Sequence, residues 1–407
     1  MIQYIEGVAQ MKSIIKSLMV LSALLLLVAG CEYDVAEPQW NKDHPNPAVP
    51  EITSLEPAEG AGAGVNFITI NGNNFAEGAE RNRVYFTNIE VEVLGSSASS
   101  ITVRRPNLVS DDAMVKVVSY DALLVADYGP YPVSRVHELY GNFIENLPLA
   151  TLAADHDENL YVVETTSRNI VQIKPGGEKT VVGVGNGAVS DLKVSPAGQL
   201  IVLFNNREIQ QVNPDAVVDT ASIWVEVASR VKYGDFDSNG NFYCGTRSSD
   251  LITVKASDLS NSKLGIYARD EIFDVQVSGG YVYVLVEARS SEPAMAIWRH
   301  PILDADGNLG SQELVLDWSQ TGAYAESTPT AFTLDAESNL YVSTDYADPV
   351  FVLYADGTQD TYYKDILPAP ISQLAWGNGT YLYMIWDGDP DKNVVRVDMG
   401  VNGPDAM

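Results

Sequence analysis

The amino-acid sequence predicts an all-β protein in which a small β-sandwich precedes a six-bladed β-propeller. A four-residue apolar motif recurs six times in the second part of the chain, and consecutive copies start 40, 42, 40, 58 and 42 residues apart. Before these repeats, residues 50–119 contain short runs in which apolar and polar residues alternate, as they do in half-buried strands. The 31 Gly, 20 Pro and 21 Tyr residues suit tight turns between packed strands.

The chain begins with a predicted lipoprotein signal peptide at residues 1–30. Two lysines precede a largely apolar run, Leu18 to Gly30, which is too short for the roughly 20 residues of a membrane-spanning helix. The run ends in Val28-Ala29-Gly30-Cys31, which resembles the bacterial lipobox. That resemblance implies cleavage before Cys31 and lipidation of Cys31. We therefore expect a chain that is exported from the cytoplasm and lipid-anchored to a membrane.

Residues 31–47 are predicted to be a polar tether, because they contain three prolines and few aliphatic side chains. Acidic residues follow Cys31 closely. An acidic segment at this place resembles the signal that sends lipoproteins of Bacteroidota to the outside of the outer membrane, and a plain solvated linker has the same composition. The predicted location is the outer membrane or the cell surface.

The net charge limits the classes of binding partner, and the cysteine content limits the possible disulfides. The chain carries a net charge of −29 at pH 7, and a surface this acidic repels the phosphates of nucleic acid. No nucleic-acid partner is therefore expected. Once Cys31 is lipidated, Cys244 is the remaining cysteine, so an intrachain disulfide is excluded and stability must come from burial.

Residues 48–131 are predicted to form the sandwich. The segment Pro50 to Gly60 reads as a strand and a turn, and the segment Phe67 to Phe75 as a strand that runs into Gly72-Asn73-Asn74-Phe75. This order resembles the start of an IPT/TIG domain, which implies an immunoglobulin-like sandwich. Further alternating runs at 82–86, 90–94, 100–104 and 114–119 supply the other strands. In this family the domain binds proteins or sugars, or spaces other domains.

Residues 132–407 are predicted to form the propeller. The six motif copies begin at Asn159, Gln199, Asn241, Tyr281, Asn339 and Tyr381. A period near 40 residues provides four short strands a unit, which is one propeller blade. The single step of 58 residues is explained by an insertion between Glu287 and Pro329. The pattern resembles the NHL-repeat family of six-bladed propellers.

The last motif copy leaves room for a third strand but for no fourth strand before the chain ends. Residues Val133 to Tyr140 precede the first copy and resemble the fourth strands elsewhere. We therefore expect them to complete the last blade, which closes the ring and removes an unpaired sheet edge. This places the domain boundary near Tyr131 and Pro132.

Two loops have the spacing of calcium ligands. Asp235 to Gly240 and Asp387 to Asn393 place carboxylates and amides at alternate positions. Neither loop has the closing glutamate, and ordinary turns of the repeat favour the same residues. We expect structural turns and no cofactor, with Ca²⁺ as the alternative.

One column of the repeat falls on the inner strand of each blade and is predicted to face the central channel. The column contains Thr151, Asp191, Tyr233, Asp274, Ala331 and Gln373, and the candidates for facing the channel are Asp191, Tyr233, Asp274 and Gln373. A propeller hydrolase of the gluconolactonase or paraoxonase kind would need a fuller set of acidic and Asn residues there. The sequence contains no nucleophile motif, zinc signature or phosphate loop, so no catalytic residue and no metal ligand is predicted.

Aromatic side chains are the predicted ligand-binding residues, because sugars stack their C–H faces on exposed rings. Several such rings lie in or near the long insertion, where a loop on a rigid ring suits recognition, and others belong to the last blades. The candidates are Trp298, Trp318, Tyr324, Trp376 and Trp386.

These observations favour a non-enzymatic surface or outer-membrane lipoprotein that binds a glycan or protein ligand through its propeller, with the sandwich as spacer. Its architecture resembles the tethered binding proteins of polysaccharide-uptake systems in Bacteroidota, which favours a glycan. Two alternatives stay open. One is a channel-centred lyase or lactone hydrolase, and the other is a structural envelope protein.

Overall fold

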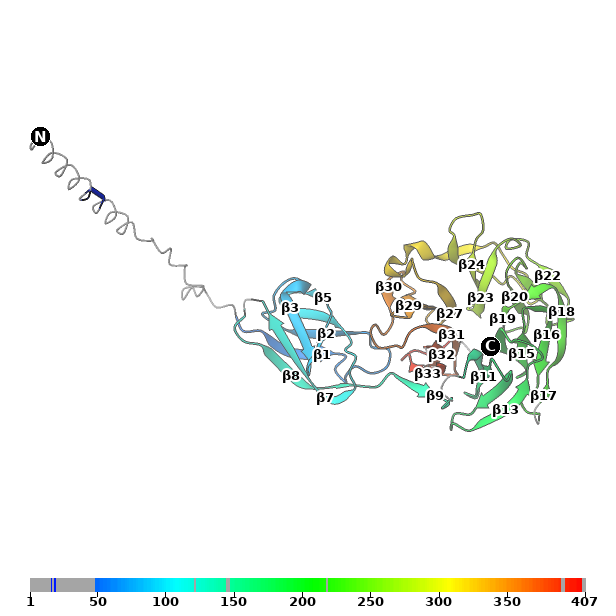
Figure 1. Cartoon of the computed structure of the whole chain (residues 1–407), viewed down its shortest axis with the longest axis horizontal. Coiled ribbons are helices and arrows are strands. Elements are labelled where there is room, and N and C mark those ends of the chain that lie inside the picture. Colours follow the sequence, from blue (N-terminus) through cyan, green and yellow to red (C-terminus); the bar gives the residue numbers. More distant parts are fainter. Residues whose placement is uncertain are drawn as a thin grey trace, which may run out of the picture. The chain divides into compact units, whose positions relative to one another are not determined.

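The computed structural model describes residues 16, 18–19, 48–120, 122–143, 147–216, 219–388 and 392–404. Residues 48–407 form one compact unit, separate from residues 1–47 (Figure 1). Cys31 and the predicted tether lie outside the described residues, as does nearly all of the predicted signal peptide. Within the described residues, no helix combines the length and the apolar character needed to cross a bilayer.

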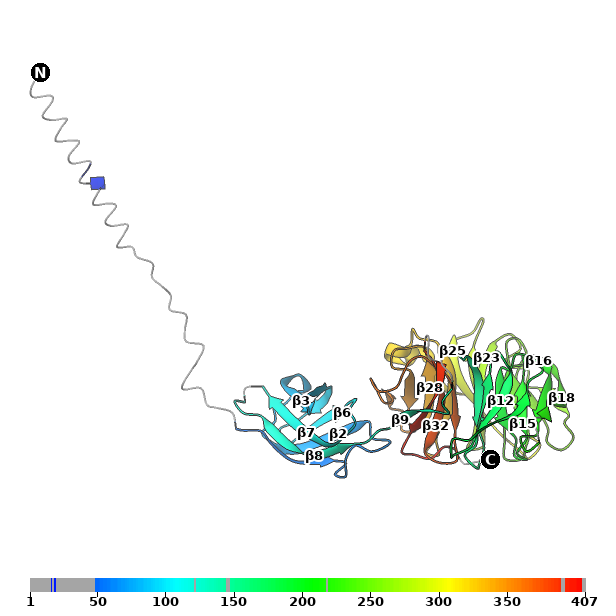
Figure 2. The same ribbon diagram turned by 60° about the horizontal axis from the view of Figure 1, so that its bottom comes forward.

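The first domain is a sandwich of two four-stranded antiparallel sheets (Figure 2). One sheet has the order β1-β2-β6-β5, with β1 (Glu51–Glu56), β2 (Phe67–Asn73), β5 (Val93–Ser96) and β6 (Ser100–Arg104). The other has the order β4-β3-β7-β8, with β3 (Asn82–Phe86), β4 (Ile89–Val91), β7 (Ser110–Ser119) and β8 (Ala126–Val133). A 3-10 turn, η1 (Ala79–Arg81), precedes β3.

Alternation along the strands builds the sandwich core. Ile68 and Ile70 of β2 are buried between the sheets, and Val84 and Phe86 of β3 meet them from the other side. Successive side chains of a strand point to opposite faces, so the intervening polar residues remain at the surface. The predicted all-β sandwich is confirmed.

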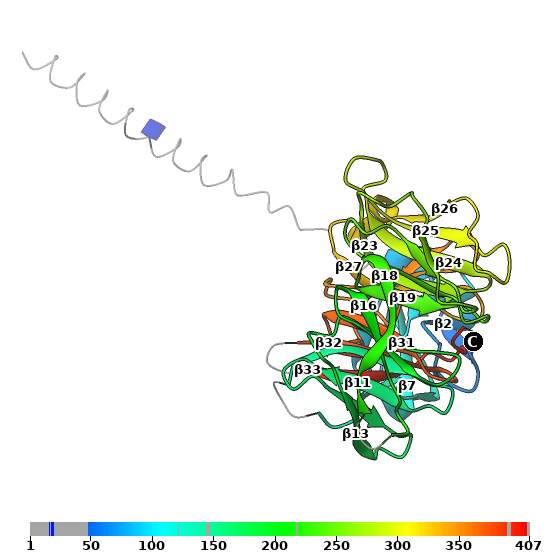
Figure 3. The ribbon, with the colours of Figure 1, turned by 90° about the vertical axis from the view of Figure 1, so that its right-hand side faces the viewer.

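The second domain is a ring of six sheets whose neighbouring strands run antiparallel, except for the short edge strand of residues 219–220 (Figures 1 and 3). Blade 1 has β10 (Leu149–Ala154), β11 (Leu160–Glu164), β12 (Asn169–Ile173) and β13 (Lys179–Val184), extended by β17 (Asp219–Thr220); blade 2 has β14 (Asp191–Val194), β15 (Leu200–Leu203), β16 (Asn206–Val212) and β18 (Ser222–Val231); blade 3 has β19 (Tyr233–Phe236), β20 (Phe242–Gly245), β21 (Ile252–Val254) and β22 (Asn261–Lys263).

Blade 4 has β23 (Glu271–Ser278), β24 (Tyr281–Glu287), β25 (Met295–Pro301) and β26 (Glu313–Asp317); blade 5 has β27 (Pro329–Leu334), β28 (Leu340–Thr344), β29 (Val350–Leu353) and β30 (Gln359–Thr361); blade 6 has β31 (Ile371–Trp376), β32 (Tyr381–Asp387), β33 (Lys392–Asp398) and β9 (His137–Tyr140). Each of the six motif copies falls on the second strand of a blade. The predicted six-bladed propeller is therefore confirmed.

The second strands are apolar throughout because both of their faces are covered. In β15, Leu200 and Val202 pack in the cluster shared with blade 1, whereas Ile201 and Leu203 pack in the cluster shared with blade 3. A strand that is buried on both faces loses the apolar and polar alternation of a half-buried strand. This explains why the motif appears in the sequence as a continuous apolar run.

The ring closes through β9, which pairs antiparallel with β33 and so completes blade 6. The predicted closure is confirmed, with one correction to the strand bounds. Val133 belongs to β8, opposite Ser110, and is buried in the sandwich core. The closing strand is therefore the shorter segment His137–Tyr140, and residues 134–136 connect the two domains.

The predicted long insertion after Glu287 is mostly regular structure. It contains β25 and β26 of blade 4 and two 3-10 turns, η2 (Trp318–Gln320) and η3 (Gly322–Tyr324). The extra length lies chiefly in the connection between β25 and β26 and in these turns. The expectation of a long exposed recognition loop is therefore wrong for most of this segment.

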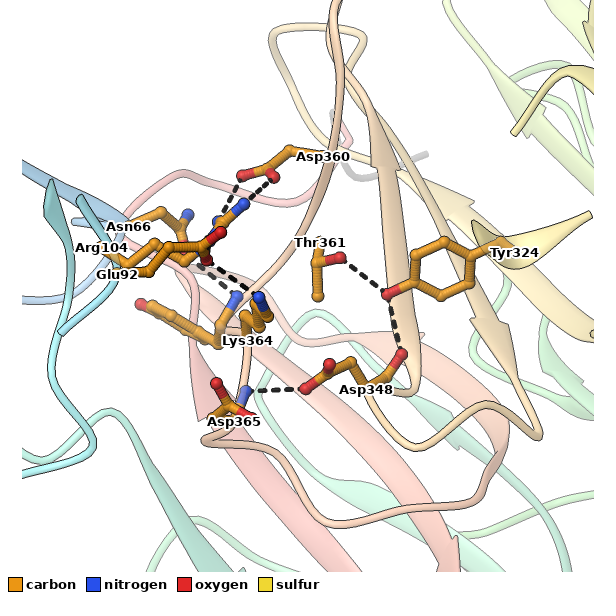
Figure 4. Close-up of polar contacts among 10 residues, drawn as sticks. Asn66, Glu92, Arg104, Tyr324, Asp348, Asp360, Thr361, Lys364 and Asp365 are labelled. Atoms are coloured by element: carbon orange, nitrogen blue, oxygen red, sulfur yellow. Dashed lines mark hydrogen bonds and ion pairs between the residues drawn. The ribbon is translucent and has the colours of Figure 1, made fainter. Parts of the chain in front are cut away.

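A charged cluster joins the sandwich to blade 5 (Figure 4). Arg104 of β6 donates two hydrogen bonds to the Asp360 carboxylate of β30, at 2.7 and 3.0 Å. Its Nε donates to Glu92 at 2.9 Å, and Lys364 donates to the same Glu92 oxygen at 2.9 Å. The hydrogen bond from Lys364, with help from Arg104, lowers the pKa of Glu92 despite its partial burial. A bidentate ion pair such as Arg104–Asp360 fixes the relative orientation of the two side chains as well as the distance between them.

The backbone continues this junction between the domains. The amide of Tyr363 donates to Asn66 Oδ1 at 2.9 Å, and the amide of Gly64 donates to the Tyr363 hydroxyl at 2.6 Å. Gly64 has a φ of 76°, and a Cβ there would lie 2.9 Å from the carbonyl oxygen of Met399. A side chain would therefore push the domains apart. The sandwich and the propeller are docked through specific contacts as well as joined by the connector.

Candidate functional site

The inner strands carry the polar residues that the sequence assigned to the channel. Asp191, Tyr233 and Asp274 pair with Leu203, Gly245 and Leu285 on their second strands. Gln373 pairs with Ile385 in the same way. These four residues occupy equivalent positions in four blades, as the repeat alignment required.

Three inner-strand aspartates link neighbouring blades. Asp191 Oδ2 accepts the amide of Gly234 at 3.1 Å, and Asp274 Oδ2 accepts the amide of Phe332 at 3.0 Å. Asp235 Oδ2 accepts the amide of Val277 at 2.8 Å. An innermost strand has no neighbouring strand on its channel side. The backbone amides on that side therefore need other hydrogen-bond partners. Each carboxylate supplies such a partner for the next blade.

The sequence analysis missed the positive charge in this cluster, Lys193. Burial alone would lower its pKa, but the charges of Asp235, Asp191 and Asp274 outweigh burial and raise it. Burial raises the pKa of Asp191 to about 6 and that of Asp274 to about 7, and it raises the pKa of Asp235 as well. Lys193 follows Asp191 by two residues on one strand and so shares its face, a signal that could have revealed it.

The channel carboxylates are therefore already engaged. A calcium ion takes six to eight oxygen ligands, whereas these oxygens accept backbone amides, and the charge of Lys193 acts on the same carboxylates. The residues that the structure describes contain no group of three or more acidic, His or Cys side chains suited to a metal ion. The three carboxylates therefore brace blades 2, 3, 4 and 5 against one another, with Lys193 as the nearby positive charge.

The loop at Asp235 to Gly240, which was expected to be a structural turn with Ca²⁺ as the alternative, forms an ordinary turn. Asp237 accepts the amides of Asn239 and Asn241 at 2.9 Å each, and it also accepts the Asn241 side chain and the Tyr243 hydroxyl. The same four bonds form around Asp155 and Asp335 in blades 1 and 5. In the second predicted loop, Asp389 and Asp391 lie outside the described residues.

Two of the candidate aromatic residues are core residues. Trp318 and Tyr324 are 3% and 4% exposed, and they pack in one cluster with Phe351. The Trp318 Nε1 donates to the carbonyl of Ser327 at 3.0 Å. The expectation that these rings are exposed for stacking is wrong, because the 3-10 turns fold them back against blade 5. Trp298 is partly buried against the cluster of blades 3 and 4.

Trp376 and Trp386 lie at opposite ends of blade 6. Trp386 is opposite Ile371, where β31 begins, whereas Trp376 is the last residue of β31. The Trp386 Nε1 donates to the carbonyl of Ala369 at 3.0 Å. Of the five predicted aromatic residues, Trp376 is the one that lines a described pocket.

This pocket, which we call the closure pocket, has a volume of about 490 Å³ and lies where the inner strands end. Three turns line it, at residues 154–157, 194–198 and 376–379, together with residues 402–404 near the end of the chain. Asp235, Gln276 and Val277 contribute from the inner strands. A volume of this size falls within the range of ligand sites, roughly 300 to 1,000 Å³.

The rim of the closure pocket carries polar side chains. His156, Asp157 and Asn378 are exposed there. In the wall, the buried Nε1 of Trp376 has no hydrogen-bond partner among the described residues. An unsatisfied buried donor of this kind is costly.

The sixth motif copy, like the second and the fourth, lacks the aspartate that begins the turns of blades 1, 3 and 5. Gly377 stands in its place, and a Cβ there would lie 2.4 Å from a carboxylate oxygen of Glu158. Glu158 instead reaches over from blade 1 and accepts the Tyr383 hydroxyl at 3.1 Å.

The fold and pocket define a class: an immunoglobulin-like sandwich docked on a six-bladed propeller whose channel mouth is hollowed at the ring closure. Residues 50–131 match the IPT/TIG domain family, so the first domain is an IPT/TIG domain, as its sequence resemblance indicated. No curated protein matches the chain.

Solved structures with the same fold have different functions. An auxiliary nutrient binding protein from Bacteroides thetaiotaomicron is 13% identical, with a TM-score of 0.51 over 86% of this chain and 97% of that one. A luciferin-regenerating enzyme is 17% identical, with a TM-score of 0.51 over 66% and 97%. Regucalcin from Agrobacterium tumefaciens, a calcium-binding protein, is 16% identical, with a TM-score of 0.50 over 67% and 97%. At these identities the likeness shows the fold alone.

Proposed function

We propose that this protein is a non-enzymatic binding protein that takes a neutral, polyhydroxylated ligand, such as the end of a glycan chain, in the closure pocket. The observation that carries the proposal is the pocket itself, where Trp376 and polar turn residues meet in a volume of about 490 Å³. Sugars combine apolar C–H faces with hydroxyl groups, so they suit an aromatic wall beside polar side chains.

Charge favours a neutral ligand over an anionic one. Asp155, Asp157 and Asp235 all line the pocket, and the whole chain carries a net charge of −29. Phosphates and uronic acids would be repelled by this field. The nutrient-binding protein among the structural neighbours agrees with a binding role, although its likeness concerns the fold.

The enzyme alternative depends on the channel carboxylates. A channel-centred hydrolase would need Asp191 or Asp274 to reach a substrate, and both carboxylates accept backbone amides of the next blade. Their hydrogen bonds favour a structural role, which is why we place the ligand in the closure pocket.

The binding test uses the mature chain, a screen of neutral oligosaccharides and calorimetry of the strongest binder. We expect His156→Ala combined with Asn378→Ala to weaken binding roughly 10- to 100-fold, because two hydrogen bonds are lost. The melting temperature should stay unchanged, since both side chains are exposed.

Ser238→Ala is the matched control for this test. Ser238 occupies the same turn position in blade 3 and lies outside the residues that line the pocket. Full binding by the double variant, or an equal loss in the control, would refute the proposed site.

The proposed cellular setting is the outer membrane or the cell surface, with lipid at Cys31 and the IPT/TIG domain as spacer. The lipobox-like segment before Cys31 supports this anchor. In cells, we expect Cys31→Ser to abolish incorporation of labelled palmitate, whereas Cys244→Ser should retain it because Cys244 is buried. Labelling that persists in the Cys31 variant would contradict the anchor.

A further inference from the structure

The turn between β7 and β8 of the sandwich exposes a group of apolar side chains. Tyr120, Leu123, Leu124 and Val125 are 68%, 61%, 60% and 41% exposed. We call these four residues the apolar tip. Other large exposed apolar residues, such as Ile223 and Leu303, are scattered singly, which is ordinary for a protein surface. Four within six positions of one turn need another explanation.

The apolar tip lies at the end of the sandwich where β1 begins. Asn74 Nδ2 donates to the carbonyl of Val49 at 2.9 Å, which places the start of the domain beside the end of β2. From there, Asn82 Nδ2 donates to the carbonyl of Ala76 at 2.7 Å, and the Ser119 hydroxyl donates to Asn82 at 2.8 Å. Ser119 immediately precedes the tip.

The junction with the propeller is at the opposite end of the sandwich. There the Tyr131 hydroxyl donates to the carbonyl of Pro57 at 3.0 Å, and the amide of Ala61 donates to the carbonyl of Pro132 at 2.9 Å. The apolar tip therefore points away from the propeller and lies at the end of the sandwich where β1 begins.

The length of this preceding segment sets the reach of the tip. The 17 residues from Cys31 to Pro47 would have an end-to-end distance of roughly 20–25 Å as a flexible chain. A domain tethered at that distance samples positions in which its near end touches the membrane surface. The tip is the apolar part of that near end.

We propose that the apolar tip inserts into the interfacial region of the membrane to which Cys31 is anchored, an inference that rests on the proposed anchor. Leucine side chains gain free energy by leaving water, and tyrosine prefers the boundary between headgroups and acyl chains. The Arg81 guanidinium lies 5.7 Å from the centre of the Tyr120 ring, a position suited to lipid phosphate. Together with the docked junction, this second contact orients the closure pocket relative to the membrane.

The test replaces the native lipid by a tether of known chemistry. The mature chain carries a histidine tag in place of Cys31 and is bound to phosphatidylcholine vesicles that contain a nickel-chelating lipid. Zwitterionic lipid avoids repulsion of this acidic chain. An environment-sensitive fluorophore is attached at Leu123→Cys, and buried Cys244 is protected from labelling. The matched control carries the fluorophore at Ile223→Cys, which is 58% exposed on the propeller.

The expected result is a shift of the Leu123→Cys emission to shorter wavelength, with quenching by nitroxides on the acyl chains, while the Ile223→Cys emission keeps its position in water. Equal behaviour of the two labels would overturn the proposal. Because the tag supplies the tether, a failure of lipidation at Cys31 in cells cannot imitate that outcome, and it would count against the proposed anchor alone.

Discussion

A chain that starts at Gly141 should unfold far more readily than one that starts at Ser134. Both chains lack the sandwich, and they differ in β9, which forms the outer strand of blade 6. Loss of β9 removes its backbone pairing with β33 and the buried Tyr140 ring. It also removes the ion pair between Glu138 and Arg396. We expect a loss of roughly 5 kcal/mol, from several hydrogen bonds and one buried ring.

Such a loss is a large part of the stability of an ordinary domain, about 5–15 kcal/mol. Urea unfolding, followed by circular dichroism, measures the difference between the two chains. Equal midpoints would show that the ring does not depend on β9. A chain that starts at Ser134 and is itself unfolded would show that the propeller needs the docked sandwich, and Glu138→Pro in the full chain would then test the strand alone.

The second large effect concerns the charge brace in the channel. Lys193→Met should destabilise the protein by about 3–5 kcal/mol at pH 8, because it leaves buried carboxylates without their cation. Asp191 and Asp274 already have pKa values raised to about 6 and about 7 by burial. Lys174→Met, at an exposed surface pair, should cost well under 1 kcal/mol.

The folding stability of the Lys193→Met variant should also depend on pH, and it should increase as the pH falls. The folded-state pKa values of Asp191 and Asp274 lie above the ordinary value of 3.8. The folded state therefore binds protons more readily than the unfolded chain, and stability rises as the pH falls from about 8 to about 5. Urea midpoints at several pH values measure this. A loss that is independent of pH would show that Lys193 acts through packing.

Much of the fold was predictable from sequence because the propeller signal is local. Each second strand, such as Leu200–Leu203, is covered on both faces by neighbouring blades, so the motif stays apolar and keeps its period. The closing strand was also predictable, because the last repeat lacked a fourth strand. The bounds of the closing strand were not predictable. Val133 is apolar and would suit a strand of either domain, and its contacts in the sandwich core assign it to the first domain.

The candidate site was less predictable because burial depends on the tertiary neighbours of a residue. Trp318 and Tyr324 were candidates because they are aromatic residues in or near a long insertion. The 3-10 turns instead pack both rings against Phe351. Asp191 and Asp274 were placed on the inner strands correctly, but their bonds to the next blade depend on geometry between repeats. Trp376 lies in the closure pocket, and its role in binding stays a prediction.

Hydrogen exchange of the full chain tests the closure pocket most directly, with and without a saturating amount of the oligosaccharide found in the screen. We expect slower exchange at residues 155–157 and 377–379, which line the pocket, and unchanged exchange at residues 302–312 between β25 and β26. Protection at residues 302–312, with none at the pocket turns, would contradict ligand binding in the closure pocket and place it in the insertion.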